Sequence, residues 1–138
     1  MTIQPYLFFN GRCEEALEFY KATLGATVEM MMRFKENPDG CDAPMMPQDT
    51  NKIMHACLRI GEAQVLCSDG MEHGKPNFQG FSLSLTVATE AEADKAFNAL
   101  AKEGQIQMPI GKTFFSPRFG AVADKFGVSW MVIVPGHM

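Results

Sequence analysis

The sequence lacks the features that mark three broad classes of protein. It has no apolar run approaching the roughly 20 residues of a membrane-spanning helix, and its N-terminus lacks the charged start and apolar stretch of a signal peptide. It also has no clustered stripe of Lys and Arg, and its formal net charge is -4. We therefore expect a cytoplasmic protein that binds neither nucleic acid nor membrane.

Two further absences concern cysteine and glycine. The cysteines, Cys13, Cys41, Cys57 and Cys67, show no C-x-x-C spacing, so we expect reduced thiols. No glycine-rich turn stands between a strand and a helix, and a nucleoside cofactor usually needs such a turn. This absence argues against methyl transfer from a nucleoside cofactor.

What the sequence does contain is the same pattern twice. In the first copy a short apolar strand leads into a helical stretch, Cys13 to Leu24, which stops at Gly25. In the second, Phe81 to Val87 leads into Thr89 to Glu103, which stops at Gly104. Further strands follow each helix. The repeat predicts one domain, residues 1–138, with modules at about 1–69 and 81–138 and a connector at about 70–80. It also predicts a ligand site where the copies meet.

Alternation along the strands predicts which side chains share a face of the sheet. The segments 52–60 and 63–68 form a hairpin around Gly61-Glu62. The expected apolar face comprises Met54, Ala56, Leu58, Val65 and Cys67, and the expected mixed face His55, Cys57, Arg59, Gln64, Leu66 and Ser68. In the second module, Ser82, Ser84 and Thr86 share a semi-polar face, and Ser129, Met131 and Ile133 alternate with Val128, Trp130, Val132 and Val134.

Two features are harder to assign from the pattern. The segment 35–51 is an unusually long loop, a candidate lid or subunit contact. The chain has 11 methionines, with runs at 30–32 and 45–46. Thioethers suit copper, but we expect these side chains to fill an irregular core or an adaptable pocket.

Four stretches resemble the PhnB-like branch of the vicinal oxygen chelate superfamily, which includes glyoxalase I, extradiol dioxygenases and bleomycin resistance proteins. They are PYLFFNG at 5–11, EALEFY at 15–20, TFF at 113–115 and DKFGVSWM at 124–131. The resemblance implies an α+β fold of two tandem βαβββ modules, which form a cupped mixed sheet with helices on the outer face. It also implies a homodimer.

The enzymes of that superfamily hold a divalent metal through His, Gln or Glu side chains on four strands. By the resemblance, these positions fall near Pro5, Leu66, Ser82 and Met131. None of the four is a competent ligand, because such metals need imidazole or carboxylate donors. We therefore expect no metal and no other cofactor.

The candidate pocket residues lie on the expected mixed faces and in the loop before the last strands. His55 and Cys57 could form a thiolate–imidazole pair, be two ligands of an unusual metal site, or line the pocket. Arg59 and Arg118 could hold an anionic group. Aromatic and thioether side chains could wall the ligand. The full candidate set is His55, Cys57, Arg59, Leu66, Ser82, Ser84, Phe114, Phe115, Arg118, Trp130 and Met131.

Three functions are open at this point. The first is a metal-free protein that binds an unidentified small hydrophobic or weakly anionic molecule in the cup between its modules. The second is an enzyme of the lyase, dioxygenase or transferase class, with either a divalent metal or a metal-free site in which Arg118 is electrophile and His55 is base. The third is a dimeric assembly module, with the loop 35–51 as a contact.

Overall fold

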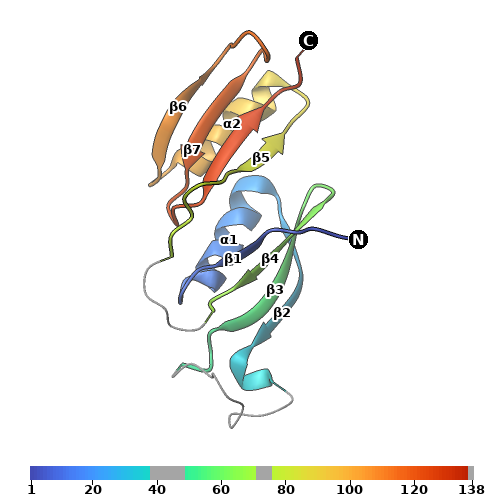
Figure 1. The fold of residues 1–138 in the computed structure, drawn as a ribbon, viewed down its shortest axis with the longest axis vertical. Coiled ribbons are helices and arrows are strands. Elements are labelled where there is room, and N and C mark those ends of the chain that lie inside the picture. Colours follow the sequence, from blue (N-terminus) through green and yellow to red (C-terminus); the bar gives the residue numbers. More distant parts are fainter. Residues whose placement is uncertain (38–48, 71–75, 137–138) are drawn as a thin grey trace. The chain divides into compact units, whose positions relative to one another are not determined.

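The computed structural model describes residues 1–37, 49–70 and 76–136. The chain forms two compact units, Met1–Pro76 and Asn77–Met138. Each is a four-stranded mixed sheet with one helix against one face (Figure 1). The predicted α+β fold of two βαβββ modules is confirmed, and each module forms its own mixed four-stranded sheet.

The first unit has its strands in the order β1-β4-β3-β2, with β1 parallel to β4 and the other pairs antiparallel. Its elements are β1 (Tyr6–Phe8), α1 (Cys13–Leu24), β2 (Thr27–Arg33), the 3₁₀ turn η1 (Phe34–Glu36), β3 (Ile53–Ile60) and β4 (Ala63–Ser68). The predicted hairpin is confirmed, because β3 and β4 are joined by Gly61 and Glu62, with Gly61 at φ 60.

The core of the first unit lies between α1 and its sheet. The helix buries Ala16, Leu17 and Tyr20, and the strands contribute buried side chains that include Ala56, Leu58, Val65 and Cys67. The predicted apolar face is therefore confirmed at these strand positions. The helix ends as predicted at Gly25, whose φ of 66 is left-handed and whose N–H donates to the Tyr20 carbonyl.

Two side chains of the first sheet depart from simple alternation. Ser68, expected on the mixed face, is buried, where its hydroxyl accepts from the Gly70 N–H at 2.8 Å and donates to the Ile53 carbonyl at 3.4 Å. Met54 is only half-buried, while Ile53 is fully buried. The pairing of β2 with β3 shifts between Met32 and Arg33, so the regular pattern does not extend to the start of β3.

The Asp69 carboxylate ties three segments of the first unit together. Asp69 is 5% exposed. Its Oδ1 accepts from the Gly11 N–H at 2.7 Å and the Cys13 N–H at 2.8 Å, and its Oδ2 accepts from the Ile53 N–H at 2.7 Å. The end of β4 is thereby fixed to the start of α1 and the start of β3.

The second unit repeats the topology with the strand order β5-β8-β7-β6, in which β5 and β8 are parallel. Its elements are β5 (Leu83–Thr86), α2 (Glu90–Ala101), β6 (Gln105–Gly111), β7 (Phe119–Ala123) and β8 (Ser129–Ile133). The strand β5 is shorter than the predicted 81–87. It lies at the edge of the sheet, and only Leu83 to Thr86 pair with β8, opposite Trp130 to Ile133.

Helix α2 begins as predicted, but its end differs. The Thr89 hydroxyl accepts from the Glu92 N–H at 3.1 Å, which is the expected N-cap. The helix ends at Ala101, and the left-handed residue after it is Glu103, at φ 61. Gly104 is therefore not the helix stop. A Cβ there would lie 2.3 Å from the Ala123 carbonyl oxygen, so glycine is needed for the close approach of two backbones.

Three cysteines, Cys13, Cys57 and Cys67, are free thiols, as predicted, and Cys41 lies outside the described residues. So do Met45, Met46 and most of the loop 35–51. Met30 and Met31 are 42% and 39% exposed on the edge strand β2, so they do not fill the core. Of the helices in the described ranges, none combines the length and apolarity that a membrane crossing requires.

Candidate functional site

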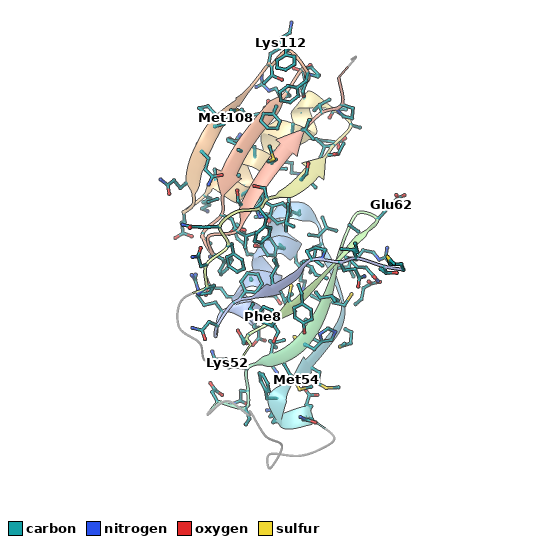
Figure 2. All side chains as sticks on the ribbon, viewed as in Figure 1. Phe8, Lys52, Met54, Glu62, Met108 and Lys112 are labelled. Atoms are coloured by element: carbon teal, nitrogen blue, oxygen red, sulfur yellow. The ribbon has the colours of Figure 1, made fainter. Side chains whose placement is uncertain are left out.

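The face of the first sheet opposite α1 carries an aromatic row. The rings of Tyr6 and Phe8 stack with centroids 4.9 Å apart, and Phe8 is 52% exposed on β1 (Figure 2). Tyr6 Oη lies 2.8 Å from His55 Nδ1, and Leu66 is the register neighbour of Tyr6. Burial raises the pKa of Tyr6, so the phenol keeps its proton at neutral pH and can donate it in a hydrogen bond.

Cys57 has a different partner from His55. Its Sγ lies 3.7 Å from Glu29 Oε1, and burial together with the Glu29 charge raises the pKa of Cys57. A raised pKa leaves the sulfur as a thiol, which is a weak nucleophile. Among the described residues no hydrogen bond joins His55 to Cys57, so the structure does not assemble the thiolate–imidazole pair.

Arg59 is held by the same carboxylate. Its Nε donates to Glu29 Oε2 at 3.0 Å, and the Gln64 amide donates to Oε1 at 2.9 Å. Both hydrogen bonds lower the pKa of Glu29, and the bond from Gln64 has the larger effect. The sequence analysis missed Glu29, because its face cannot be read from alternation where the β2–β3 register shifts between Val28 and Met30. An anionic ligand would have to compete with Glu29 for this guanidinium.

A groove of about 710 Å³ runs over the second unit, on the face of its sheet opposite α2. None of its lining side chains is ionisable, although 20% of the residues of the chain are charged. The lining comprises Phe78, Gln79, Gly80, Phe81, Ser82, Gln105, Gln107, Ala123, Gly127, Ser129 and Met131. Its volume falls within the usual range for small-molecule sites, roughly 300–1,000 Å³.

The groove exists because the strand β7 presents small side chains on this face. Ala121 pairs with Met131, and Ala123 pairs with Ser129. On the other side, Ala123 is the register partner of Gln105 of β6, which also lines the groove. A short side chain between longer ones on the flanking strands leaves a depression along the sheet. Phe81 and Met131, 46% and 37% exposed, are its main apolar surfaces.

Two hydroxyls and an amide form a chain across this groove. Ser129 Oγ donates to Gln107 Oε1 at 3.0 Å, and the Ser82 and Ser129 hydroxyls are 2.9 Å apart. Ser82 and Met131, two of the candidate pocket residues, lie in this groove, and Gln107, which lies where the β6 register shifts, was not among the candidates. Ser84, the register partner of Met131, is exposed and lies outside the lining.

Arg118 and Trp130 lie on the opposite face from Ser82 and Met131. Arg118 Nε and Nη2 donate to the Asp94 carboxylate of α2 at 2.8 and 3.1 Å, and this pairing raises the pKa of Arg118. Trp130, expected to wall the ligand, is instead 3% exposed in the core, and its Nε1 donates to Asp124 Oδ2 at 2.9 Å. Both side chains hold the unit together.

Phe114 and Phe115 lie at a second, smaller depression. It measures about 380 Å³ and is lined by the loop 112–117 with Pro135 and Gly136. Phe114 is 94% exposed, and Phe115 makes edge contacts with Phe114 and Phe119. Phe114 and Phe115, which were predicted to contact the ligand, therefore lie near each other but do not line the groove of about 710 Å³.

The residues at the four metal positions that the resemblance implies do not fit a divalent metal. They are Pro5, Leu66, Ser82 and Met131, and none of these side chains offers an imidazole or carboxylate donor. In the ranges 1–37, 49–70 and 76–136, no three His, Cys, Asp or Glu side chains come together as a metal site. The metal-free assignment remains a prediction.

Comparisons with known proteins identify close relatives. A protein-family model described as 3-demethylubiquinone-9 3-methyltransferase matches residues 1–133. Protein YjdN of Escherichia coli K12 is 38% identical over 141 aligned residues, covering 97% of this chain and 95% of YjdN. The structure of PA1353 from Pseudomonas aeruginosa is 42% identical, covers 98% of both chains and superposes with a TM-score of 0.84.

Two further structures connect the chain to a wider group. A Bacillus cereus protein, whose description pairs the name PhnB with the demethylubiquinone methyltransferase label, is 32% identical with a TM-score of 0.80, covering 97% of this chain and 99% of its own. A glyoxylase/bleomycin resistance/dioxygenase domain from Frankia is 13% identical, with a TM-score of 0.68 and coverage of 96% and 94%. The latter likeness concerns the fold alone.

Proposed function

Since the chain belongs to the PhnB-like family described as 3-demethylubiquinone-9 3-methyltransferase, we propose that it is a PhnB-like protein that binds a small, largely apolar molecule without a metal. The binding site is the groove of the second unit, formed by Phe81, Met131 and the side chains between them. The ligand is held by contact with the ring and the thioether and by hydrogen bonds to neutral groups.

The observation that carries the proposal is the uncharged lining of this groove. A charged ligand would be poorly accommodated, because the lining offers no opposite charge to offset its desolvation. Apolar contact with Phe81 and Met131 favours an aromatic or aliphatic body. Of the two ligand types considered at the outset, hydrophobic and weakly anionic, the groove favours the hydrophobic one.

The family description names a methyltransferase, and two features argue against that chemistry here. The sequence contains no G-x-G-x-x-G stretch, and the segments that lead into α1 and α2 are Asn10-Gly11-Arg12 and Val87-Ala88-Thr89. Neither is a glycine-rich phosphate or nucleoside turn. We therefore assign binding, not methyl transfer.

A second candidate function is favoured by one contact, the Tyr6–His55 hydrogen bond of 2.8 Å. A phenol that keeps its proton, beside an imidazole on an open sheet face, is a possible acid–base pair for a metal-free reaction. Replacement Tyr6→Phe removes that proton and leaves the groove of the second unit unchanged. It therefore separates a reaction on the first sheet from binding in the groove.

The homodimer that the resemblance implies stays a proposal, as does the cytoplasmic location. Sedimentation equilibrium of the full chain tests the dimer directly. A single species at 15.3 kDa would contradict it.

The experiment for the groove is a titration of the chelator-treated full chain with methyl 2-naphthyl ketone, a neutral and mainly apolar probe, followed by ¹H–¹⁵N correlation spectra. We expect shifts at Ala123, Ser129 and Met131. Ala123→Leu fills the depression and should weaken binding at least about fivefold. The matched control Ala91→Leu, on the exposed side of α2, should leave it unchanged. Shifts confined to other regions of the chain would overturn the proposal.

A further inference from the structure

The hydrogen-bond chain in the groove has a defined direction. Ser129 has one hydroxyl proton, and it is donated to Gln107 Oε1 at 3.0 Å. The Ser82 and Ser129 hydroxyls are 2.9 Å apart, so Ser82 must supply the proton of that contact. This leaves Ser82 Oγ with lone pairs to offer and Gln107 Nε2 with two hydrogens to donate.

Within the described part of the chain, neither of these remaining capacities is used by another hydrogen bond. Both side chains are exposed and line the same groove. Because both groups are open to water, a ligand that displaces this water keeps the hydrogen bonds only if it offers one acceptor and one donor. The groove thus offers one donor at Gln107 and one acceptor at Ser82, beside the apolar surface of Phe81.

We propose that the ligand carries a neutral amide-like group, with a carbonyl that accepts from Gln107 Nε2 and an N–H that donates to Ser82 Oγ. Primary amides, lactams, ureas and the edges of nucleobases share this pairing. This inference rests on the proposed function, because it names the class of molecule that the same groove binds.

The uncharged lining of the groove should distinguish amides from carboxylates of the same shape, and its hydrogen-bond acceptor should distinguish them from ketones. A carboxylate has the same shape as a primary amide, but it carries a charge and no hydrogen to donate at neutral pH. No cationic side chain lines the groove to balance it. A methyl ketone keeps the carbonyl but lacks the donor. The site should therefore rank amide first, ketone second and carboxylate last.

The test compares 2-naphthamide, methyl 2-naphthyl ketone and 2-naphthoate, which share one ring system. Binding to the full chain is followed by ¹H–¹⁵N spectra at pH 7. We expect 2-naphthamide to bind about fivefold more tightly than the ketone, as one additional hydrogen bond allows, and 2-naphthoate to bind more weakly than both. In Ser82→Ala the amide should lose its advantage over the ketone, whereas Gln107→Leu removes the donor that both carbonyls use and should weaken both compounds.

The outcomes separate this inference from the proposed function. If all three compounds bind in the groove equally, or if Ser82→Ala weakens amide and ketone alike, the amide class is wrong and apolar binding stands. If none of the three shifts the groove residues, both proposals fail. Melting curves of the two variants establish that each is folded, and Ser84→Ala, exposed and outside the lining, should leave the ranking unchanged.

Discussion

The Cys57 thiol is half-buried on the first sheet, 3.7 Å from a Glu29 oxygen. Burial and the carboxylate raise its pKa, so the reactive thiolate forms only at a higher pH than for an ordinary cysteine. We expect alkylation of Cys57 by iodoacetamide to be slow at neutral pH and to accelerate above the ordinary thiol range. Peptide mass spectrometry at a series of pH values measures it.

The Glu29→Gln variant is the matched control for that profile. Removal of the carboxylate should lower the pKa of Cys57 and shift the alkylation curve towards lower pH, while Arg59, now without its partner, adds to the effect. The fully buried Cys13 and Cys67 should stay unmodified in the folded protein. A Cys57 profile identical in both proteins would show that Glu29 has no part in holding the thiol protonated.

Asp69 contributes to stability through its three N–H partners. In Asp69→Asn, one carboxylate oxygen becomes an amide nitrogen that cannot accept, so either the Gly11 and Cys13 N–H groups or the Ile53 N–H group loses its partner. We expect the free energy of unfolding to fall by about 2–3 kcal/mol, since hydrogen bonds to a buried charge are lost. Urea denaturation measures the change, and Glu62→Gln, exposed in the hairpin turn, should change it by less than about 0.5 kcal/mol. Equal effects of the two variants would contradict this role.

The sequence allowed the faces of single strand residues to be predicted where the strands are regular. The alternation of Met131 with Trp130 was predicted correctly, since β5 and β8 pair without interruption and Trp130 is buried while Met131 is exposed. Glu29 and Gln107 were missed, because both lie where the register shifts. Alternation cannot predict a side chain's direction at such a shift, since the shift depends on the partner strand.

The two glycines after the helices have different physical roles, although the sequence pattern treats them alike. Gly25 has a left-handed φ of 66 and open space where a Cβ would be, whereas a Cβ at Gly104 would lie 2.3 Å from a carbonyl oxygen. We expect Gly25→Ala to cost about 1 kcal/mol and Gly25→Asn less, because asparagine tolerates the left-handed conformation.

At Gly104 both substitutions should be costly, because any side chain meets the Ala123 carbonyl. We expect Gly104→Ala and Gly104→Asn each to cost about 1–3 kcal/mol, again from urea denaturation. If Asn were better tolerated than Ala at both positions, the steric explanation for Gly104 would be wrong.

The stretch 124–131, which carries part of the family resemblance, is explained by the turn between β7 and β8. Asp124 Oδ1 accepts from the Phe126 and Val128 N–H groups at 2.9 and 3.1 Å, and Oδ2 accepts from Trp130. The motif therefore maintains the fold, and most of its residues are not ligand contacts. The sequence alone could not distinguish residues that maintain the fold from residues that contact a ligand, because an aromatic side chain looks the same in a sequence whether it is buried or exposed.

For the protein as a whole, the central chemical expectation is that it needs no divalent metal. Chelator treatment followed by zinc, nickel or manganese should change the melting temperature by less than about 1 °C, because no stabilising metal site is restored. Differential scanning calorimetry measures it. A stoichiometric metal with a rise of several degrees would revive the metal-dependent enzyme.

The fold was predictable because the repeat, the helix start at Thr89 and the strand alternation all depend on local spacing. The groove was not, since it depends on which strand brings Ala121 and Ala123 between longer side chains. Strand order is a property of the folded chain. The pairing of Arg118 with Asp94, 24 residues apart, is unpredictable for the same reason.

The most direct measurement is the titration of the chelator-treated full chain with methyl 2-naphthyl ketone, compared between wild type and Ala123→Leu by ¹H–¹⁵N spectra. The account predicts saturable shifts at Ser82, Gln107 and Ser129 in the wild type and much weaker binding in the variant. Equal binding by both proteins, or shifts that appear only after metal is added, would contradict it.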